Sequence, residues 1–140
     1  MMKNNWGFLF ISMVTVTMQA QYSSDLKVED LMASEVNGIG QKISYPWFEN
    51  AKVTIKKITF PPGATTGWHM HKIPVFSYII QGTLTVEIEN DDTVQYQEGS
   101  CFAESSNIFH RGLNLDAGDL VVLAVYLGGD GQPLSIPKPD

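Results

Sequence analysis

A chain of 140 residues is long enough for one domain with a hydrophobic core and too short for two. Hydrophobic residues make up 44% and charged residues 17%, which is typical of a folded domain and argues against a disordered chain. The formal net charge is −6, and no basic stripe interrupts the spread of acidic residues, so a nucleic-acid partner is not expected. The single cysteine, Cys101, excludes an internal disulfide framework.

The first twenty residues have the three-part layout of a secretory signal peptide. Lys3 gives a positive start, an uncharged apolar run extends from Trp6 to Val16, and a short polar stretch includes Ala20. As a helix, the run would span only about 16 Å of a roughly 30 Å hydrocarbon core, which is too short for a membrane anchor. A buried N-terminal strand is the weaker alternative. We therefore predict that residues 1–20 are cleaved, which leaves a secreted or periplasmic protein with no stable membrane anchor.

Residues 21–49 form a predicted N-terminal arm. Val28, Leu31 and Met32 have helical spacing, but the stretch is short and its neighbours are polar. The pattern fits equally well a helix of one or two turns and an extended arm that lies against the following domain.

Residues 50–130 alternate between short runs rich in β-branched and aromatic residues and clusters of turn-forming residues. In one run, Thr83–Glu89, polar and apolar residues alternate as in a strand with one buried face, and Asn90–Asp92 then fits a hairpin turn. Many short strands at this spacing predict an all-β sandwich or small barrel. Residues 131–140, with three prolines, are predicted to form an extended C-terminal tail. The predicted strands are Lys52–Phe60, Val75–Ile80, Thr83–Ile88, Thr93–Tyr96, Ser100–Glu104 and Leu120–Leu127.

The chain has three histidines, and two of them form the sequence His69-Met70-His71. In a strand, residues i and i+2 point to the same face, so both imidazoles can reach one metal ion. Taken alone, the pair fits equally well two exposed or capping histidines.

The segments around the histidines resemble the two signature motifs of the cupin superfamily. The first motif has a glycine, five residues, His-x-His and a later glycine, and the second has a glycine, a turn, a histidine and an asparagine. The resemblance covers nearly all of residues 50–127, and every histidine falls on a ligand position. It implies a small double-stranded β-helix, the jelly-roll barrel of cupins. The matching residues are Gly63, His69, His71 and Gly82 in the first motif, and Gly99, His110 and Asn114 in the second.

The chain departs from the cupin pattern where the first motif has a glutamate. Val75 occupies that position, or Phe76 under the looser spacing. By resemblance, the usual site of three histidines and one glutamate therefore becomes a triple-histidine site, as in acetylacetone-cleaving and thiol dioxygenases. The chain is most similar to small single-domain cupins of the type-2 conserved-barrel kind, which share its HxHxxPxFxYxxxG motif and its PLSIP-like ending at Pro133–Pro137.

The resemblance implies one divalent metal ion bound by His69, His71 and His110. Fe, Mn, Zn and Ni are all compatible with imidazole ligands. Three neutral ligands leave the full metal charge and open coordination positions for water or an anionic small molecule. Glu104, six residues before His110, has several interpretations: a fourth ligand, a general base, a carboxylate bonded to a ligand histidine, or a solvated surface residue.

Other residues near the ligand positions are candidates for a substrate pocket. Arg111 directly follows a ligand histidine and could bind a substrate carboxylate, with an ordinary salt bridge as the alternative. Cys101 is predicted to be a small buried hydrophobic residue. Most aromatic residues of a small barrel belong to its core, yet some line a pocket. The aromatic candidates are Trp68, Phe76, Tyr78, Phe102 and Phe109.

These features predict a metal-dependent enzyme, dioxygenase-like or a hydrolase or isomerase, that acts on a small organic substrate inside the barrel. The alternative is a non-catalytic sensor or carrier of a small ligand with the same metal-containing pocket. A third possibility is a structural dimer whose barrel is fastened by the metal. Association through sheet edges would protect exposed strands, so we predict a homodimer.

Overall fold

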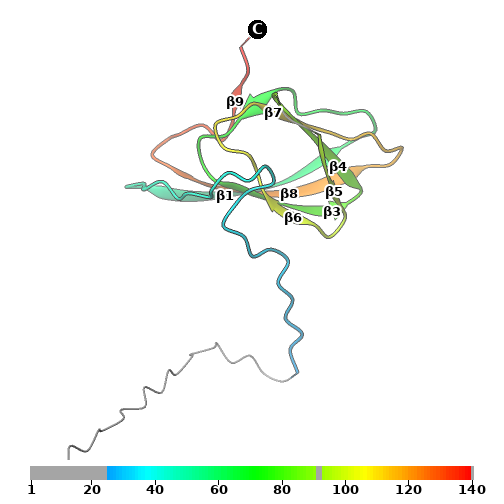
Figure 1. The fold of residues 1–140 in the computed structure, drawn as a ribbon, viewed down its shortest axis with the longest axis horizontal. Helices are drawn as coiled ribbons and strands as arrows, with labels where there is room; N and C mark the ends of the chain where they lie inside the picture. Colours follow the sequence, from blue (N-terminus) through cyan, green and yellow to red (C-terminus); the bar gives the residue numbers. More distant parts are fainter. Residues whose placement is uncertain (1–24, 91–92, 140) are drawn as a thin grey trace, which may run out of the picture.

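The computed structural model describes residues 25–90 and 93–139. Within them the chain forms nine β-strands and no helix, and hence no helix that could span a membrane. Two antiparallel sheets face each other and close into a jelly-roll barrel, as Figure 1 shows, which confirms the predicted all-β fold. The predicted signal peptide, residues 1–20, lies outside the described residues.

The strand order in the first sheet is β1-β8-β3-β6, and in the second β5-β4-β7-β2-β9. The longest pairing joins β1 and β8 in register over ten residues, from Ala51 opposite Gly129 to Phe60 opposite Leu120. Apart from the consecutive pair β4 and β5, neighbouring strands of the two sheets are thus distant in the sequence. The strands are β1 (Ala51–Phe60), β2 (His69–Met70), β3 (Val75–Gln81), β4 (Thr83–Ile88), β5 (Val94–Gln97), β6 (Cys101–Ala103), β7 (His110–Leu113), β8 (Leu120–Gly129) and β9 (Ile136–Pro137).

The six predicted strands correspond to β1, β3, β4, β5, β6 and β8. The hairpin turn predicted between β4 and β5 includes residues 91 and 92, which lie outside the described part, but the two strands pair as a hairpin requires. The strands β2, β7 and β9 were not predicted: β2 and β9 have two residues each, and β7, with the sequence HRGL, has a single large apolar residue and a glycine. β9 lies within the segment predicted as an extended C-terminal tail, where Ile136 pairs with Met70 and extends the second sheet.

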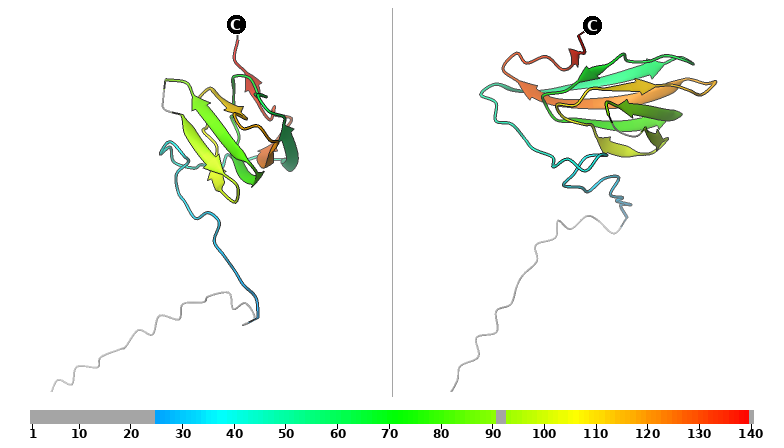
Figure 2. Two further views of the ribbon diagram at one scale, coloured as in Figure 1. Left: turned by 90° about the vertical axis from the view of Figure 1, so that its right-hand side faces the viewer. Right: turned by 45° about the horizontal axis from the view of Figure 1, so that its top comes forward.

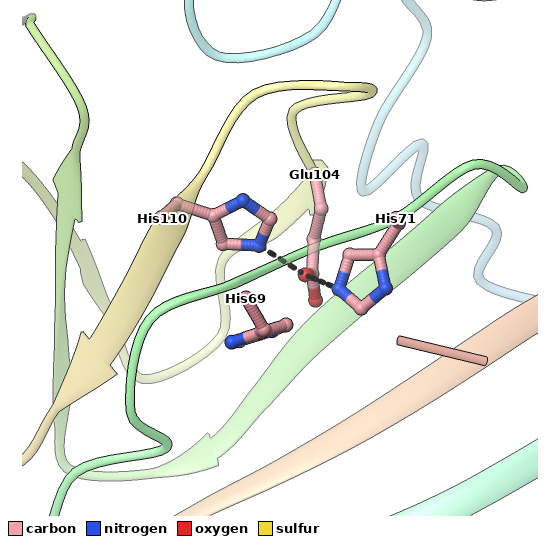
Figure 3. A group of neighbouring side chains, drawn as sticks. All are labelled: His69, His71, Glu104 and His110. Carbon is pink, nitrogen blue, oxygen red and sulfur yellow. Dashed lines mark hydrogen bonds and ion pairs between the residues drawn. The ribbon is translucent and has the colours of Figure 1, made fainter. Parts of the chain in front are cut away.

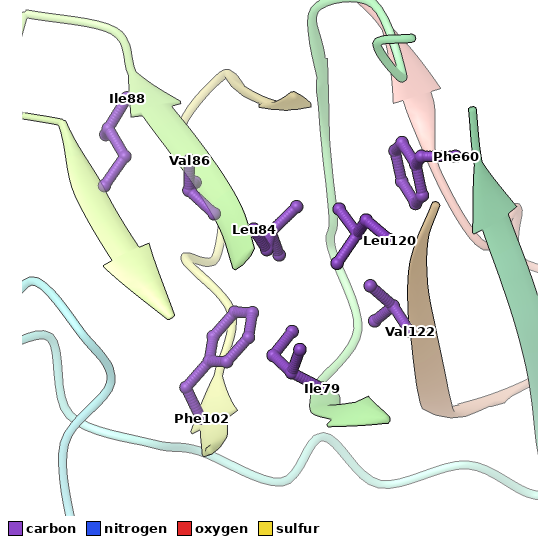
Figure 4. Packing of buried hydrophobic residues seen from close by; sticks show 8 residues of the cluster. All are labelled: Phe60, Ile79, Leu84, Val86, Ile88, Phe102, Leu120 and Val122. Carbon is purple, nitrogen blue, oxygen red and sulfur yellow. The ribbon is translucent and has the colours of Figure 1, made fainter. Parts of the chain in front are cut away.

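The core consists of side chains that point inward from both sheets. Along β8 the buried residues Leu120, Val122, Ala124 and Tyr126 follow the period of two that a strand imposes. A smaller cluster joins Ala124 and Tyr126 to Ile73 and Val75. Figure 4 shows the larger cluster, which comprises Phe60, Ile79, Leu84, Val86, Ile88, Phe102, Leu120 and Val122.

Asn114, the asparagine of the second motif, is completely buried and has a structural task. Its side-chain amide donates to the carbonyl oxygens of Phe60 and Gly118, both at 2.8 Å, and its Oδ1 accepts from the Asp116 amide at 3.1 Å. These bonds join the end of β1 to the turn between β7 and β8. Gly82 is needed at another turn, because it has φ +82° and a Cβ there would lie 3.2 Å from the Asp119 carbonyl oxygen.

The described part of the N-terminal arm is extended and not helical, and it lies outside the sheets in both views of Figure 2. Its best-anchored part is a tight turn at residues 36–42, here called the cap turn, in which Val36 bridges to Lys42. The Gln41 side chain donates a hydrogen bond to the Ser106 carbonyl oxygen at 3.2 Å, and it accepts one from the backbone amide of Ser106 at 3.1 Å. The cap turn is therefore fastened to the loop that follows β6.

Candidate metal centre

Four side chains with metal-binding atoms converge inside the barrel, as Figure 3 shows. His69 lies on β2, His71 follows β2, Glu104 follows β6 and His110 begins β7. Pairing places His69 opposite His110, and a bridge from His71 to Ser106 brings in the loop after β6. One ligand atom from each side chain lies within 4.8 Å of all the others.

Backbone carbonyl groups orient all three imidazole rings. The Nδ1 atom lies 3.0 Å from the Gly67 oxygen in His69, 2.7 Å from the Leu134 oxygen in His71, and 3.0 Å from the Ile108 oxygen in His110. A carbonyl oxygen only accepts hydrogen bonds, so each Nδ1 carries the proton. The other nitrogen, Nε2, is thereby left to bind a metal ion, the arrangement usual for metal-bound histidines.

Glu104 links the histidines. Its Oε2 lies 3.0 Å from Nε2 of His71 and 3.4 Å from Nε2 of His110, and its Oε1 accepts a 2.5 Å hydrogen bond from the Ser77 hydroxyl. The longer contact is not a hydrogen bond: Nε2 of His110 is buried and has no hydrogen-bond partner among the described residues. Such a buried, unpaired atom is costly unless something else binds it. Three imidazoles and a carboxylate supply donors that suit a divalent transition metal, so the residues fit such an ion.

The electrostatics couple Glu104 to the histidines. Burial opposes ionisation of Glu104, but the neighbouring imidazoles of His110 and His71 outweigh it and hold the carboxyl pKa far below its usual 4.5. Burial likewise disfavours a charged His71, yet the hydrogen bond and charge of Glu104 raise the pKa of that imidazole. Burial lowers the pKa of His69. In the absence of metal, Glu104 and His71 therefore form a buried ion pair whose proton a metal ion would displace.

A cavity of about 70 Å³ lies next to the four side chains. A cavity of this size can hold a few water molecules or a small organic ligand. Apolar side chains form most of its wall, while Gly38 and Ile39 of the cap turn contribute on one side. Burial, followed by the charge of Glu104, raises the pKa of two lining phenols, Tyr96 and Tyr126, the latter to about 12.

The family model described as a cupin domain matches residues 56–126, about half of the chain. The chain belongs to the cupin family. Its fold resembles that of the DMSP lyase DddQ from Ruegeria pomeroyi DSS-3, with a TM-score of 0.53 and 16% identity over 61% of this chain and 43% of that one. A Cupin 2 conserved barrel domain protein from Salinispora arenicola CNS-205 has a TM-score of 0.50 and 18% identity over 59% of this chain and 70% of that one.

At these identities the similarity to solved structures concerns the fold alone. The aligned region spans less than half the length of the DMSP lyase. No curated protein sequence matches the chain significantly.

The prediction of a cupin site with three histidines alone is not confirmed, because Glu104 joins the group. The physical reason is that the carboxylate comes from the strand next to the one that carries the usual cupin glutamate. Val75, which occupies the position of the usual cupin glutamate, accepts a 2.9 Å backbone hydrogen bond from the Glu104 amide. Glu104 therefore continues the β3–β6 pairing and directs a carboxylate to the histidines from the neighbouring strand. Its side chain is 16% exposed, which rules out the solvated surface position.

The aromatic candidates for the cupin pocket separate by the strand face on which they lie. Phe102 lines the cavity and stacks on Tyr96, with ring centroids 3.6 Å apart. Phe76 and Tyr78 alternate with the inward-facing Ser77 on β3, so they lie instead on the outer face of the sheet. They line a shallow groove there, together with Cys101, which is partly exposed and not fully buried as predicted.

Arg111 lies outside the cavity and forms an ordinary salt bridge. Its guanidinium makes a 2.6 Å ion pair with Glu87, the residue opposite it on β4, and lies 5.0 Å from the ring centroid of Trp68. Arg111 and Trp68 are therefore not among the residues that line this cavity, and they contact each other instead. Phe109 lies near Lys138, 5.8 Å from its ammonium group to the ring centroid.

Sequence reasoning missed the residues that support the centre. Ser77 holds Glu104, Ser105 lies 2.9 Å from Nδ1 of His110, and Tyr126 faces His71 with ring centroids 5.8 Å apart. The only available signal was alternation along β3 and β8, which assigns Ser77 and Tyr126 to the interior. It does not reveal what they meet there.

Proposed function

We propose that this cupin is a metal-dependent enzyme that acts on a small, oxygen-bearing organic anion inside the barrel. The observation that carries the proposal is the convergence of three oriented imidazoles and one carboxylate beside a small, mainly apolar cavity. A bound divalent metal would act as a Lewis acid that polarises a carbonyl or carboxylate group or binds dioxygen. The aligned fold also occurs in a protein named as a lyase, DMSP lyase DddQ.

The residues of the chain would position the substrate and control its surroundings. One carboxylate and three neutral imidazoles leave a divalent ion with one net positive charge, which favours an anionic ligand. The mainly apolar wall lowers the local polarity, which strengthens that attraction. The small size of the cavity favours a small substrate. We therefore propose small carboxylates or carbonyl compounds as the substrate class.

The coordination number of the metal separates an enzyme from a structural site. Zinc with four protein ligands is usually a closed tetrahedral site without room for substrate. An ion that prefers six ligands, such as Mn, Fe or Ni, keeps two positions open beside the same four residues. We therefore propose one of these three ions as the native metal.

Elemental analysis of protein purified without added metal tests this proposal. We expect about one Mn, Fe or Ni ion per chain, and turnover of at least one member of a panel of small carboxylates, dicarbonyl compounds and thiols. The matched control is Arg111→Lys, outside the cavity, which should keep both metal and turnover. Zinc bound to all four residues without turnover would favour the structural alternative. Tight binding of a panel member without its consumption would favour the carrier or sensor.

We further propose that the protein is exported and forms a homodimer. The layout of residues 1–20 supports export, and intact-mass analysis of the secreted or periplasmic fraction should show a chain that lacks them. β1 is an edge strand on which Val53 and Ile55 are 60% and 61% exposed, and a second copy could cover them. Size-exclusion chromatography with light scattering should give twice the chain mass. A mature chain that keeps Met1, or a monomer, would contradict the respective proposal.

A further inference from the structure

Tyr126 is placed beside the metal centre by the alternation of β8. It points inward with Leu120, Val122 and Ala124, and it is only 7% exposed. Its ring meets the His71 ring edge to face, with centroids 5.8 Å apart and an interplanar angle of 71°. It lines the same cavity as the four candidate metal ligands. A phenol therefore lies within the cavity wall next to the proposed reaction centre.

The Tyr126 hydroxyl has no hydrogen-bond partner among the described residues, whereas the neighbouring His71 and Glu104 side chains are paired. His71 is held by Leu134 and Glu104, and Glu104 by Ser77. Buried tyrosine hydroxyls usually find a partner, because an unpaired buried donor loses its hydrogen bond to water without replacement. The hydroxyl keeps some accessible surface and Tyr126 lines the cavity, so a small molecule bound there is a candidate partner.

We infer that the Tyr126 hydroxyl donates a hydrogen bond to an oxygen atom of the anion that the metal centre binds. The inference rests on the proposed function and deepens it. The metal takes one oxygen of the ligand, and Tyr126 takes a second, so the pair selects small carboxylates with at least two oxygen atoms over single-atom anions. Tyr126 is then a ligand-contacting residue, and it differs from Ser77, which acts on the ligand only through Glu104.

Packing alone is the competing explanation. Tyr126 belongs to a core cluster with Ile73, Val75 and Ala124, and the Lys56 ammonium lies 5.6 Å from its ring centroid. Tyr126→Phe keeps the ring and removes only the hydroxyl, so it separates the two explanations. Tyr78→Phe is the matched control: it makes the same change on the adjacent strand β3, on the outer face of the same sheet.

The test uses the full mature chain loaded with Co(II), whose visible spectrum reports on its coordination. Each protein is titrated with glycolate, which has about five non-hydrogen atoms and so matches the cavity, and separately with azide, a linear anion that can bind the metal through one nitrogen. Cobalt affinity and melting temperature are measured in parallel. We expect Tyr126→Phe to weaken glycolate binding about 10- to 100-fold, the range for a hydrogen bond to a charged acceptor. Azide binding, cobalt affinity and melting temperature should change little, and Tyr78→Phe should match wild type throughout.

The outcomes separate the inference from the proposed function. Equal glycolate affinity in wild type and Tyr126→Phe would overturn the inference and leave the proposed function standing. A lower melting temperature or weaker cobalt binding with unchanged glycolate affinity would establish packing as the role of Tyr126. A wild-type spectrum that glycolate does not change would overturn the inference, and if azide does not change it either, the proposed function falls too.

Discussion

Glu104 is the residue whose replacement tests the metal centre most directly. Glu104→Gln keeps the shape of the side chain and a carbonyl oxygen, but it removes the negative charge that lies 3.0 Å from Nε2 of His71. We expect the variant to bind divalent metal at least about 100-fold more weakly, since the loss of partners that only orient ligands already costs about 10- to 100-fold. The metal-free fold should also lose stability.

The cost to the metal-free protein follows from the contacts of the carboxylate. Hydrogen bonds to charged groups contribute about 1.5–3 kcal/mol, against about 0.5–1.5 kcal/mol for neutral pairs. In Glu104→Gln the hydrogen bonds to His71 and Ser77 no longer involve a charged carboxylate and become bonds between neutral groups. We therefore expect a loss of about 1–3 kcal/mol, or a melting temperature about 4–12 °C lower for a domain of this size.

The pH dependence of the metal-free protein provides a second readout. The pKa of Glu104 is lowered, so its contribution to stability is present above the usual 4.5 and is lost as the pH falls toward the folded value. The pKa of His71 is raised, so its contribution is present below 6.5 and is lost as the pH rises through the folded value. Metal-free wild type should therefore gain most from this pair between pH 4.5 and 6.5. The variant should lack that gain.

The assay is urea unfolding of chelator-treated protein across this pH range, with metal titration by isothermal calorimetry. Glu87→Gln is the matched control, because Glu87 forms a 2.6 Å ion pair with Arg111 in which both side chains are about one-third exposed. Such a surface pair contributes only about 0–1 kcal/mol. If the two variants lost similar, small amounts of stability and bound metal equally well, Glu104 would have no place in the metal centre.

Three further predictions concern the cap turn, the buried asparagine and proton competition. Gly38→Ala should lower the free energy of unfolding in urea by about 1–3 kcal/mol, because the new Cβ would lie 2.0 Å from the Tyr96 hydroxyl oxygen. The control Gly118→Ala, whose Cβ would have nothing within 4 Å, should change it little, and equal effects of the two variants would contradict this packing. Asn114→Ala should lower the free energy of unfolding by about 2–4 kcal/mol, since two carbonyl groups lose the donor that lies 2.8 Å from each. A melting temperature within about 1 °C of wild type would contradict that role of Asn114. Metal affinity should fall as the pH drops below the raised pKa of His71, by up to about tenfold per unit, because a proton then competes with the metal for the imidazole. Calorimetry at pH 5.5 and 7.5 checks this, and a pH-independent affinity would contradict it.

Local sequence pattern was enough to predict the strands in which polar and apolar residues alternate clearly, and to identify the three histidines as candidate metal ligands. Most of the six predicted strands carry their own period or several β-branched residues, a signal that depends only on neighbours within the strand. The histidines were recognisable because their spacing from particular glycines matches the cupin motifs. Their convergence needs only that the barrel closes in the usual way.

Tertiary structure alone decided which fourth side chain reaches the histidines and which aromatic residues line the cavity. The pairing of Glu104 with Val75 depends on how β6 lies against β3, and no residue near Glu104 in the sequence encodes that register. β9 exists only because Ile136 meets Met70 across the sheet. The sequence by itself thus determined the barrel and its three imidazoles, since these follow from local spacing. The carboxylate and the Tyr126 phenol depended on contacts between distant strands, which form only when the two sheets close.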